Sequence, residues 1–355
     1  MLMRNVVAIT AVLVPLSAIA VEAEFPLGIQ HGYPFCIAGP DDTILMAYRI
    51  GKTNKVEVAR SADTGLTWEV LSQVNCFDPV HYFGGHITRM SDDSIVMVVK
   101  DRDLRLGWIR STDGGRSWSE FVHIPLEWKF KVFAFGPLYE MSDGRWAYAT
   151  YAQNDRPESE GPFPMTTARA DADSLIVWSE DQGKTWSEPI SIPDPEDGNN
   201  SLNEIALLEY KPGKFLAAMR TDETFRRDDN KIAGFCGFYF SRSNDGINWS
   251  EPQPTGDIGR QPHFYRIGET FVLAYRQYAP YDRTGYATIR FSRNGLTWSR
   301  PFRIHRGVQD GPNIVQAGGL VVAFNQLAPT AEFPTRQVIE IPDEREWFLS
   351  PIVKP

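Results

Sequence analysis

Basic side chains recur at one position of a pattern that runs through this chain. Six short segments, expected to be β-strands, end in Arg49, Lys100, Tyr151, Arg220, Arg276 and Gln326. Guanidinium groups bind planar carboxylates and sulfates through paired hydrogen bonds. If equivalent strands surround one axis, these residues converge into a site for an anionic ligand. Alternatively, each is a solvated strand end paired with a nearby acid; the candidates are Asp101, Asp222 and Asp282.

Histidine and aromatic residues flank the strands that precede these segments. His86 and His263 open such strands, where a side chain with a pKa near neutrality could act as a general acid or base. With Tyr151 or Tyr278 nearby, either histidine could also serve a β-elimination on a uronate. The rings of Tyr33, Tyr151 and Tyr278 could stack on sugars or pack within the core.

The elements that position these residues are marked by a repeat of the form S-x-D-x-G-x-x-W. Five copies occur, two of them one residue shorter. Asp343–Trp347 is a degenerate sixth copy that lacks the glycine. The five are Ser61–Trp68, Ser111–Trp118, Ser179–Trp186, Ser243–Trp249 and Ser292–Trp298. The aspartate can accept N–H groups of its own turn, glycine supplies a positive φ, and tryptophan fills the space between strands. Each copy therefore predicts a structural hairpin with no catalytic role.

Strand candidates surround every copy of the repeat. Short apolar runs lie at 43–50, 94–100, 215–220, 270–276 and 320–326. In each unit, a second strand candidate precedes the apolar run, a third leads into the copy of the repeat, and a fourth follows the tryptophan of that copy. Four strands in each of about six units predict an all-β, six-bladed β-propeller with four-stranded blades and Asp-box hairpins, forming one domain over residues 24–355. Polar connections near 151–172 and 221–233 are expected to lie over the ligand-binding face.

Residues 1–23 have the features of a signal peptide. Arg4 precedes an apolar stretch at 6–20, and small residues after it offer cleavage sites. An N-terminal β-strand is the alternative. Cleavage predicts a secreted or periplasmic protein, whereas a retained leader fits a virion or cell-surface particle. Because Pro15 interrupts the stretch and no other segment approaches 18 apolar residues, no membrane span is expected in the mature chain.

Composition argues against several other classes of protein. The 355 residues include 36 basic and 45 acidic side chains, a net charge of −9 that lacks the basic footprint of nucleic-acid binding. Cys36, Cys76 and Cys236 are too few and too scattered for a disulfide framework or a zinc site. We expect three buried cysteines, no metal and no cofactor. The oligomeric state is left open.

The repeats are Asp boxes, also called bacterial neuraminidase repeats, and the chain after residue 23 resembles the sialidase superfamily of six-bladed propellers. Segment 203–220 is similar to the fourth-blade segment of that family, where a glutamate supports a tyrosine nucleophile and an arginine binds the substrate carboxylate. The resemblance implies these roles for Glu204 and Arg220. It also implies carboxylate binding by Arg276 and a position near the substrate for Arg49.

Three positions depart from the family pattern. The first arginine of the family's triad is absent from His31–Pro34, the acid/base aspartate from Lys52–Lys55 and the nucleophilic tyrosine from Asp310–Asn313. The resemblance therefore implies an exo-acting glycoside hydrolase with a modified site, acting on an acidic glycan or polysaccharide. The alternatives are a non-catalytic glycan-binding propeller, such as a surface lectin or virion adhesin, and a polysaccharide lyase with a His/Tyr pair.

The expected site has two groups of residues. The catalytic group is Glu204, Arg220 and Arg276. The substrate-binding group is Arg49, Lys100, Tyr33, His86, Tyr151, His263 and Tyr278.

Overall fold

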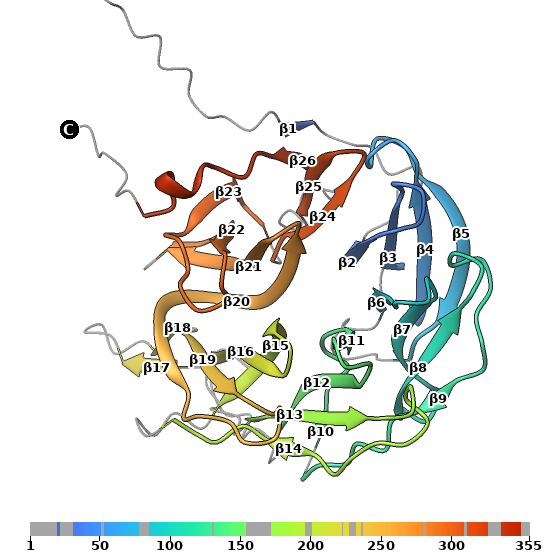
Figure 1. Ribbon diagram of the computed structural model, residues 1–355, viewed down its shortest axis with the longest axis horizontal. Helices are drawn as coiled ribbons and strands as arrows, with labels where there is room; N and C mark the ends of the chain where they lie inside the picture. The colour runs from blue at the N-terminus through green and yellow to red at the C-terminus, as the bar shows by residue number, and fades with distance from the viewer. Residues whose placement is uncertain are drawn as a thin grey trace, which may run out of the picture.

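The structure is a computed structural model whose described residues form antiparallel β-sheets arranged in a ring (Figure 1). It describes residues 20–21, 31–50, 53–77, 85–129, 131–153, 172–195, 201–221, 223–226, 232–235, 237–279, 282–308, 311–325 and 335–348. Within these residues the only helical element is a 3-10 turn, Glu344–Glu346. The fold is therefore all-β, as the sequence predicted. No helix among the described residues is long and apolar enough to cross a membrane.

Two four-stranded sheets follow one another in chain order. The first contains β2 (His31–Ala38), β3 (Ile44–Ile50), β4 (Lys55–Ser61) and β5 (Glu69–Asn75). The second contains β6 (His86–Arg89), β7 (Ile95–Lys100), β8 (Leu106–Ser111) and β9 (Val122–His123). Each strand pairs with the next, so both sheets are simple antiparallel meanders.

The third sheet and the last sheet follow the same plan with short additional strands. The third contains β10 (Lys131–Val132), β11 (Leu138–Glu140), β12 (Trp146–Gln153), β13 (Ala172–Ser179) and β14 (Ile190–Ser191). The last contains β24 (Asn313–Ala317), β25 (Leu320–Asn325), β26 (Thr335–Ile339) and β1 (Ala20–Val21). Strand β1 is the part of the expected leader that is described; its backbone pairs with β26, and the rest of residues 1–23 lies outside the described residues.

A seven-stranded sheet lies between these two in chain order. It contains β15 (Leu202–Lys211), β16 (Lys214–Thr221), β19 (Gly237–Ser243), β20 (Gln253–Ile267), β21 (Thr270–Ala279), β22 (Asp282–Ser292) and β23 (Phe302–Arg306). The first part of β20 pairs with β19 and its second part with β21. One long strand thus joins two antiparallel halves, β15–β20 and β20–β23. Strands β17 (Glu223–Arg226) and β18 (Ile232–Phe235) form a separate hairpin.

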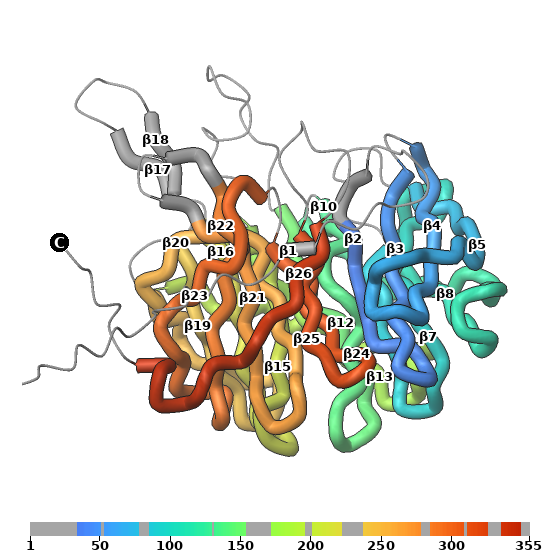
Figure 2. Tube along the Cα trace, turned by 90° about the horizontal axis from the view of Figure 1, so that it is seen from above, coloured from blue at the N-terminus to red at the C-terminus, as the bar shows by residue number. Residues whose placement is uncertain are grey.

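The central strands of the sheets contain the core. The predicted apolar runs coincide with β3, β7, β16, β21 and β25 to within a few residues at either end. All six residues of β7 are buried, because neighbouring sheets cover both of its faces. This explains why these strands read as continuous apolar runs instead of alternating patterns. Figure 2 shows the sheets from the side, with strands running between the two faces of the ring.

The Asp boxes form the predicted hairpin turns. In the first box, Asp63 Oδ1 accepts hydrogen bonds from the backbone N–H groups of Leu66 and Thr67, and Ser61 Oγ accepts one from Gly65. The equivalent bonds recur around Asp113, Asp181 and Asp245. Hydrogen bonds from Thr67 and neighbouring groups outweigh desolvation and lower the pKa of Asp63 to about 2. The box is therefore a self-contained structural unit.

Box glycines and tryptophans also pack each sheet against the one before it. Gly246 has φ 80°, and a Cβ placed there would lie 2.4 Å from the Trp178 ring of the preceding sheet. Gly183 stands in the same relation to Trp108, at 2.9 Å. Glycine is thus required by close packing between sheets as well as by its turn. The sequence predicted that each box tryptophan fills the space between neighbouring strands. Trp249 also packs between sheets, because it contacts the core shared by the third sheet and the β15–β20 half.

The sixth box does not form the expected hairpin. Trp347 instead follows the 3-10 turn Glu344–Glu346, which lacks the glycine of the other copies. Its indole nevertheless stacks on Phe291, with ring centroids 5.5 Å apart, in the core between the β20–β23 half and the last sheet. The position in the packing is retained although the turn is different.

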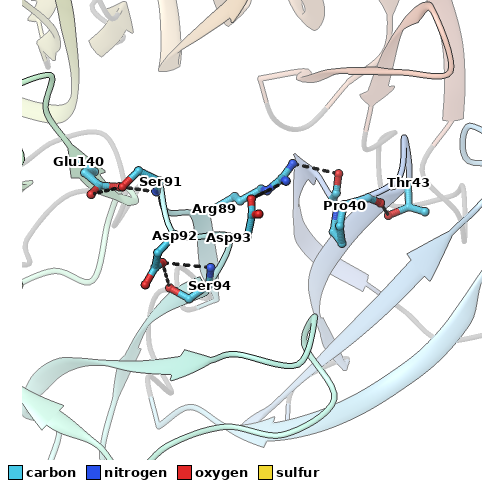
Figure 3. Close-up of polar contacts among 9 residues, drawn as sticks. Pro40, Thr43, Arg89, Ser91, Asp92, Asp93, Ser94 and Glu140 are labelled. Atoms are coloured by element: carbon cyan, nitrogen blue, oxygen red, sulfur yellow. Dashed lines mark hydrogen bonds and ion pairs between the residues drawn. The ribbon is translucent and has the colours of Figure 1, made fainter.

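Polar contacts at the first hairpins link neighbouring sheets (Figure 3). The backbone N–H and the hydroxyl of Ser91 donate to the Glu140 carboxylate at 2.6 and 2.8 Å. Ser142 binds Glu209 in the same manner one sheet further on. On the other side, Arg89 donates to the Gly39 carbonyl. The serine–glutamate contact thus occurs at two successive junctions between sheets, and the arginine contact links the first two sheets.

Candidate functional site

The three predicted arginines occupy equivalent positions in their sheets. Arg49, Arg220 and Arg276 lie opposite Gly32, Asn203 and Arg260 of the preceding strands. In all three pairs the register shifts immediately after this position, as at a β-bulge. The equivalent strand ends predicted from the sequence thus have equivalent register in the structure.

Glu204 lies within one of these bulges and holds Arg220. Its backbone has φ 48°, its side chain is buried, and Oε2 lies 2.9 Å from Arg220 Nε. The same Nε lies 2.6 Å from Asn203 Oδ1. Two acceptors on β15 therefore fix the orientation of one buried guanidinium on β16.

The Glu204 carboxylate also links the two halves of the seven-stranded sheet. Its Oε2 accepts the backbone N–H of Gln261 at 2.8 Å, and Gln261 has a positive φ of 54° in its own bulge. The Gln261 side-chain oxygen accepts the N–H of Gly311 at 3.1 Å. Sequence reasoning missed Gln261, although it follows Arg260 as Glu204 follows Asn203. Glu204 is thus a counter-ion and a structural acceptor in this conformation.

Similar bonds join other innermost strands. His86 Nε2 accepts the Gly136 N–H at 3.3 Å, and the Tyr139 hydroxyl accepts the Leu207 N–H at 3.2 Å. Asn313 closes the ring by donating to the Pro34 carbonyl at 2.6 Å. Side chains near the axis therefore satisfy backbone groups of the next sheet, which stabilises their mutual placement.

An aromatic cluster occupies the centre of the ring. Phe35 and His86 have ring centroids 3.5 Å apart, and His263 lies 6.2 Å from His86 and 6.0 Å from Phe135. His86 is only 1% exposed. Packed rings thus enclose His86 in this structure, and its role at the substrate stays a prediction. Desolvation lowers the pKa of His263 to about 4, so this imidazole is neutral at physiological pH.

The remaining predicted residues are mostly enclosed. Arg49 is 2% exposed and its Nε donates to the Thr53 carbonyl at 2.8 Å. Lys100 is buried and donates to the Val132 carbonyl at 3.0 Å. Tyr151 is buried and stacks on Phe133 at 4.4 Å. These three side chains make internal contacts in this conformation, which differs from the expected open ring of cations.

The side chains of Tyr33 and Tyr278 lie outside the described residues, as does Gln326. Arg276 is half-buried, and Gly285 makes room for it, since a Cβ there would lie 2.4 Å from its Nε. Of the acids offered as alternative partners, Asp101 pairs with Arg105 at 2.6 Å. Asp222 and the Asp282 side chain lie outside the described residues.

The described cysteines match their prediction. Cys36 and Cys76 are free and buried, and burial raises the pKa of the Cys36 thiol. Cys236 lies outside the described residues. Within the described part of the chain, no three His, Cys, Asp or Glu side chains gather as metal ligands would.

The environment of His263 predicts a pH-dependent stability. Its pKa is depressed to about 4 from an ordinary value near 6.5, so the neutral form stabilises the fold. This contribution is complete above pH 6.5 and is lost as the pH falls towards 4; at about 1.4 kcal/mol per pKa unit it amounts to about 3 kcal/mol. Urea titrations of the wild type and of His263→Phe across this pH range should show a weaker slope in the variant. His123→Phe, on exposed β9, should retain the wild-type slope; equal slopes for wild type and His263→Phe would refute the assignment.

Comparison with known proteins found one family model and several solved structures that resemble the chain. Residues 87–257 match the family model of the BNR repeat-like domain. A Dyadobacter fermentans protein of unknown function shares 18% identity at a TM-score of 0.66, covering 91% of this chain and 98% of its own. No curated protein matches the chain.

Two enzymes share the fold at low identity. A Hadza microbial sialidase has 16% identity and a TM-score of 0.59, covering 88% of this chain and 66% of its own. A Penicillium chrysogenum α-L-arabinanase, solved with arabinobiose, has 12% identity and a TM-score of 0.56, covering 91% and 97%. The match to the BNR repeat-like domain, together with these neighbours, supports the resemblance to the sialidase superfamily. The neighbours by themselves show the fold alone.

Proposed function

We propose that this protein is a six-bladed, sialidase-type propeller that binds the carboxylate of an acidic glycan. Counting the two halves of the seven-stranded sheet separately, and leaving out the β17–β18 hairpin, supports the number six. The observation that carries the proposal is the equivalent register of Arg49, Arg220 and Arg276, each beside a bulge of the innermost strand. The two enzymes that share the fold, a sialidase and an arabinanase, also act on glycans. The expected leader would bring such a protein to where glycans occur.

Arg220 is the centre of the proposed site. Bonds from its Nε to Glu204 and Asn203 hold the guanidinium in one plane, so little side-chain entropy is lost when a ligand binds. A carboxylate prefers the planar, bidentate hydrogen bonding that a guanidinium group offers. Glu204, by contrast, is already engaged with Arg220 and with the Gln261 N–H. The contacts therefore favour recognition of the carboxylate over catalysis by Glu204.

Exo-hydrolysis is the second candidate. It is supported by the pairing of Glu204 with Arg220 at 2.9 Å, since these are the two residues whose roles the family resemblance implies. For hydrolysis, Glu204 would have to act together with a further acid or nucleophile.

A panel of acidic glycans distinguishes the functions. Incubation with sialosides and polyuronates should show saturable binding, whereas neutral counterparts should bind more weakly. Released sugar would support the hydrolase, and new absorbance at about 235 nm, where enol-ether uronates absorb, would support a lyase instead. The proposal is wrong if no acidic glycan binds.

Two arginine variants test the site. Arg220→Ala should weaken acidic-glycan binding by roughly 30-fold or more, the effect of removing one partner of a buried charge pair. Arg276→Lys should weaken it by about tenfold, because an ammonium cannot reproduce the planar fork. The control is Arg266→Ala, an exposed residue at the far end of β20, which should bind normally. Calorimetry on variants whose folding has been checked by circular dichroism gives the affinities; unchanged affinity in both would contradict the site.

A further inference from the structure

A hollow of about 340 Å³ lies between the β15–β20 half and the β20–β23 half of the seven-stranded sheet. The residues that matter here are Phe240 and Arg242 on β19, Gln253 and Thr255 on β20, Arg290 on β22, and the box residue Trp298. Its volume is at the lower end of the range for small-molecule sites. It admits one or two sugar rings, but not a folded partner segment.

The hollow is separate from the arginine site. Arg220 lies opposite Phe238 in the β16–β19 ladder, whereas Arg242 lies four residues further along β19, opposite Leu216. At about 3.3 Å per residue, this places the two positions roughly 13 Å apart along the sheet. Arg242 also directly precedes the box Ser243–Trp249, so the hollow lies towards the box end of the strands.

One wall of the hollow is aromatic. The Trp298 ring centroid lies 6.3 Å from that of Phe240 and 5.6 Å from that of Phe264, so the indole is held in place by neighbouring rings. Aromatic faces of this kind pack against the apolar face of a sugar ring, while the indole N–H seeks an acceptor.

That indole N–H differs from those of the neighbouring boxes. Trp186 and Trp249 each donate from Nε1 to the glycine carbonyl of their own box at 3.1 Å. The Trp298 Nε1 is enclosed and has no acceptor within the described part of the chain. A buried donor without an acceptor is costly, so a small movement of the indole that let an oxygen from outside the chain reach this N–H would be favourable.

Two guanidinium groups complete the lining. Arg290 donates from Nε to the Ser299 carbonyl at 2.5 Å and from Nη1 to Asp257, whose carboxylate is 10% exposed. These bonds fix the guanidinium, and its Nη2 has no acceptor among the described residues. Arg242 is exposed, and its guanidinium forms no ion pair with any residue that the structure describes. One carboxylate thus faces two cations, which leaves the hollow positively charged within a chain of net charge −9.

We propose that this hollow is a second glycan-binding site, which takes one acidic sugar residue. The sugar ring packs on Trp298 and Phe240, and a ring or hydroxyl oxygen accepts the indole N–H once the indole shifts to expose it. The carboxylate or sulfate of the sugar binds Arg242 and Nη2 of Arg290. Gln253 and Thr255 supply hydrogen-bonding groups for sugar hydroxyls. This inference goes beyond the proposed function, because it shares no residue with the arginine site.

The Trp298 indole resonance provides a direct test. In ¹⁵N-labelled full-length protein, loss of one indole signal in Trp298→Phe assigns it. Sialyllactose and trigalacturonate are then titrated to about 10 mM, well above a millimolar dissociation constant, with lactose as the neutral control. At least one acidic saccharide should shift the Trp298 signal saturably, and lactose should shift it much less.

A matched pair of arginine variants identifies the ligand's partner. Arg242→Gln should raise the dissociation constant read from the Trp298 signal by about tenfold or more. Arg60→Gln is the control, because Arg60 holds the same position before the serine of the first box but does not line the hollow. The inference is overturned if neither acidic saccharide shifts the signal, or if Arg242→Gln leaves the dissociation constant unchanged. Calorimetric binding lost only in Arg276→Lys, with a silent Trp298 signal, would overturn this site and leave the arginine site standing.

Discussion

Replacing Glu204 with alanine should lower the free energy of unfolding by about 3–5 kcal/mol, the cost of breaking a buried ion pair from one side. Glu204 is 4% exposed and Arg220 8% exposed, so the guanidinium would remain buried without its counter-ion. The Gln261 N–H would also lose its acceptor. Urea denaturation with linear extrapolation measures the change.

Three further variants identify the cause of this loss. Glu204→Gln retains an acceptor for the Gln261 N–H but removes the charge, and should fall between wild type and Glu204→Ala. The double variant Glu204→Ala/Arg220→Ala should recover part of the loss, because no buried charge remains. Glu269→Ala, on an exposed turn, should change stability by less than about 0.5 kcal/mol. A Glu204→Ala protein as stable as Glu269→Ala would contradict the structural role of this carboxylate.

Truncating Trp347 to alanine should cost about 3–5 kcal/mol, as for other fully buried aromatic side chains. Trp347 is 1% exposed, stacks on Phe291 and donates from Nε1 to the Pro342 carbonyl at 2.9 Å. The variant removes this packing between the β20–β23 half and the last sheet, so thermal unfolding should occur at a clearly lower temperature.

The next residue in the chain is a built-in control for this prediction. Phe348 is 57% exposed, and Phe348→Ala should change stability by less than about 0.5 kcal/mol. Trp347→Phe should be intermediate, because it keeps an aromatic ring and loses the bond to Pro342. Equal stabilities for Trp347→Ala and Phe348→Ala would show that the last, worn box does not contribute to the packing between sheets.

Local signals in the sequence determined the elements of this fold. The Asp box is readable because its bonds connect residues at most four positions apart, as from Ser61 and Asp63 to Gly65 and Thr67. Strands such as β7 and β16 are readable because both of their faces are buried, which demands continuous apolar residues. The position of Arg49, Arg220 and Arg276 at the ends of equivalent apolar runs likewise anticipated their equivalent register.

Only the tertiary structure decided what the functional side chains contact. Glu204 binds the N–H of Gln261, which is 57 residues away, and His86 packs on Phe35 from another sheet. The hollow beside Trp298 exists because β20 crosses from one half of its sheet to the other. Burial and pairing of this kind depend on how the sheets pack around the ring. They could not be predicted from residue type and spacing, because those do not specify which sheets contact one another. The sequence alone therefore located the arginines, and the packed sheets determined which of them are engaged.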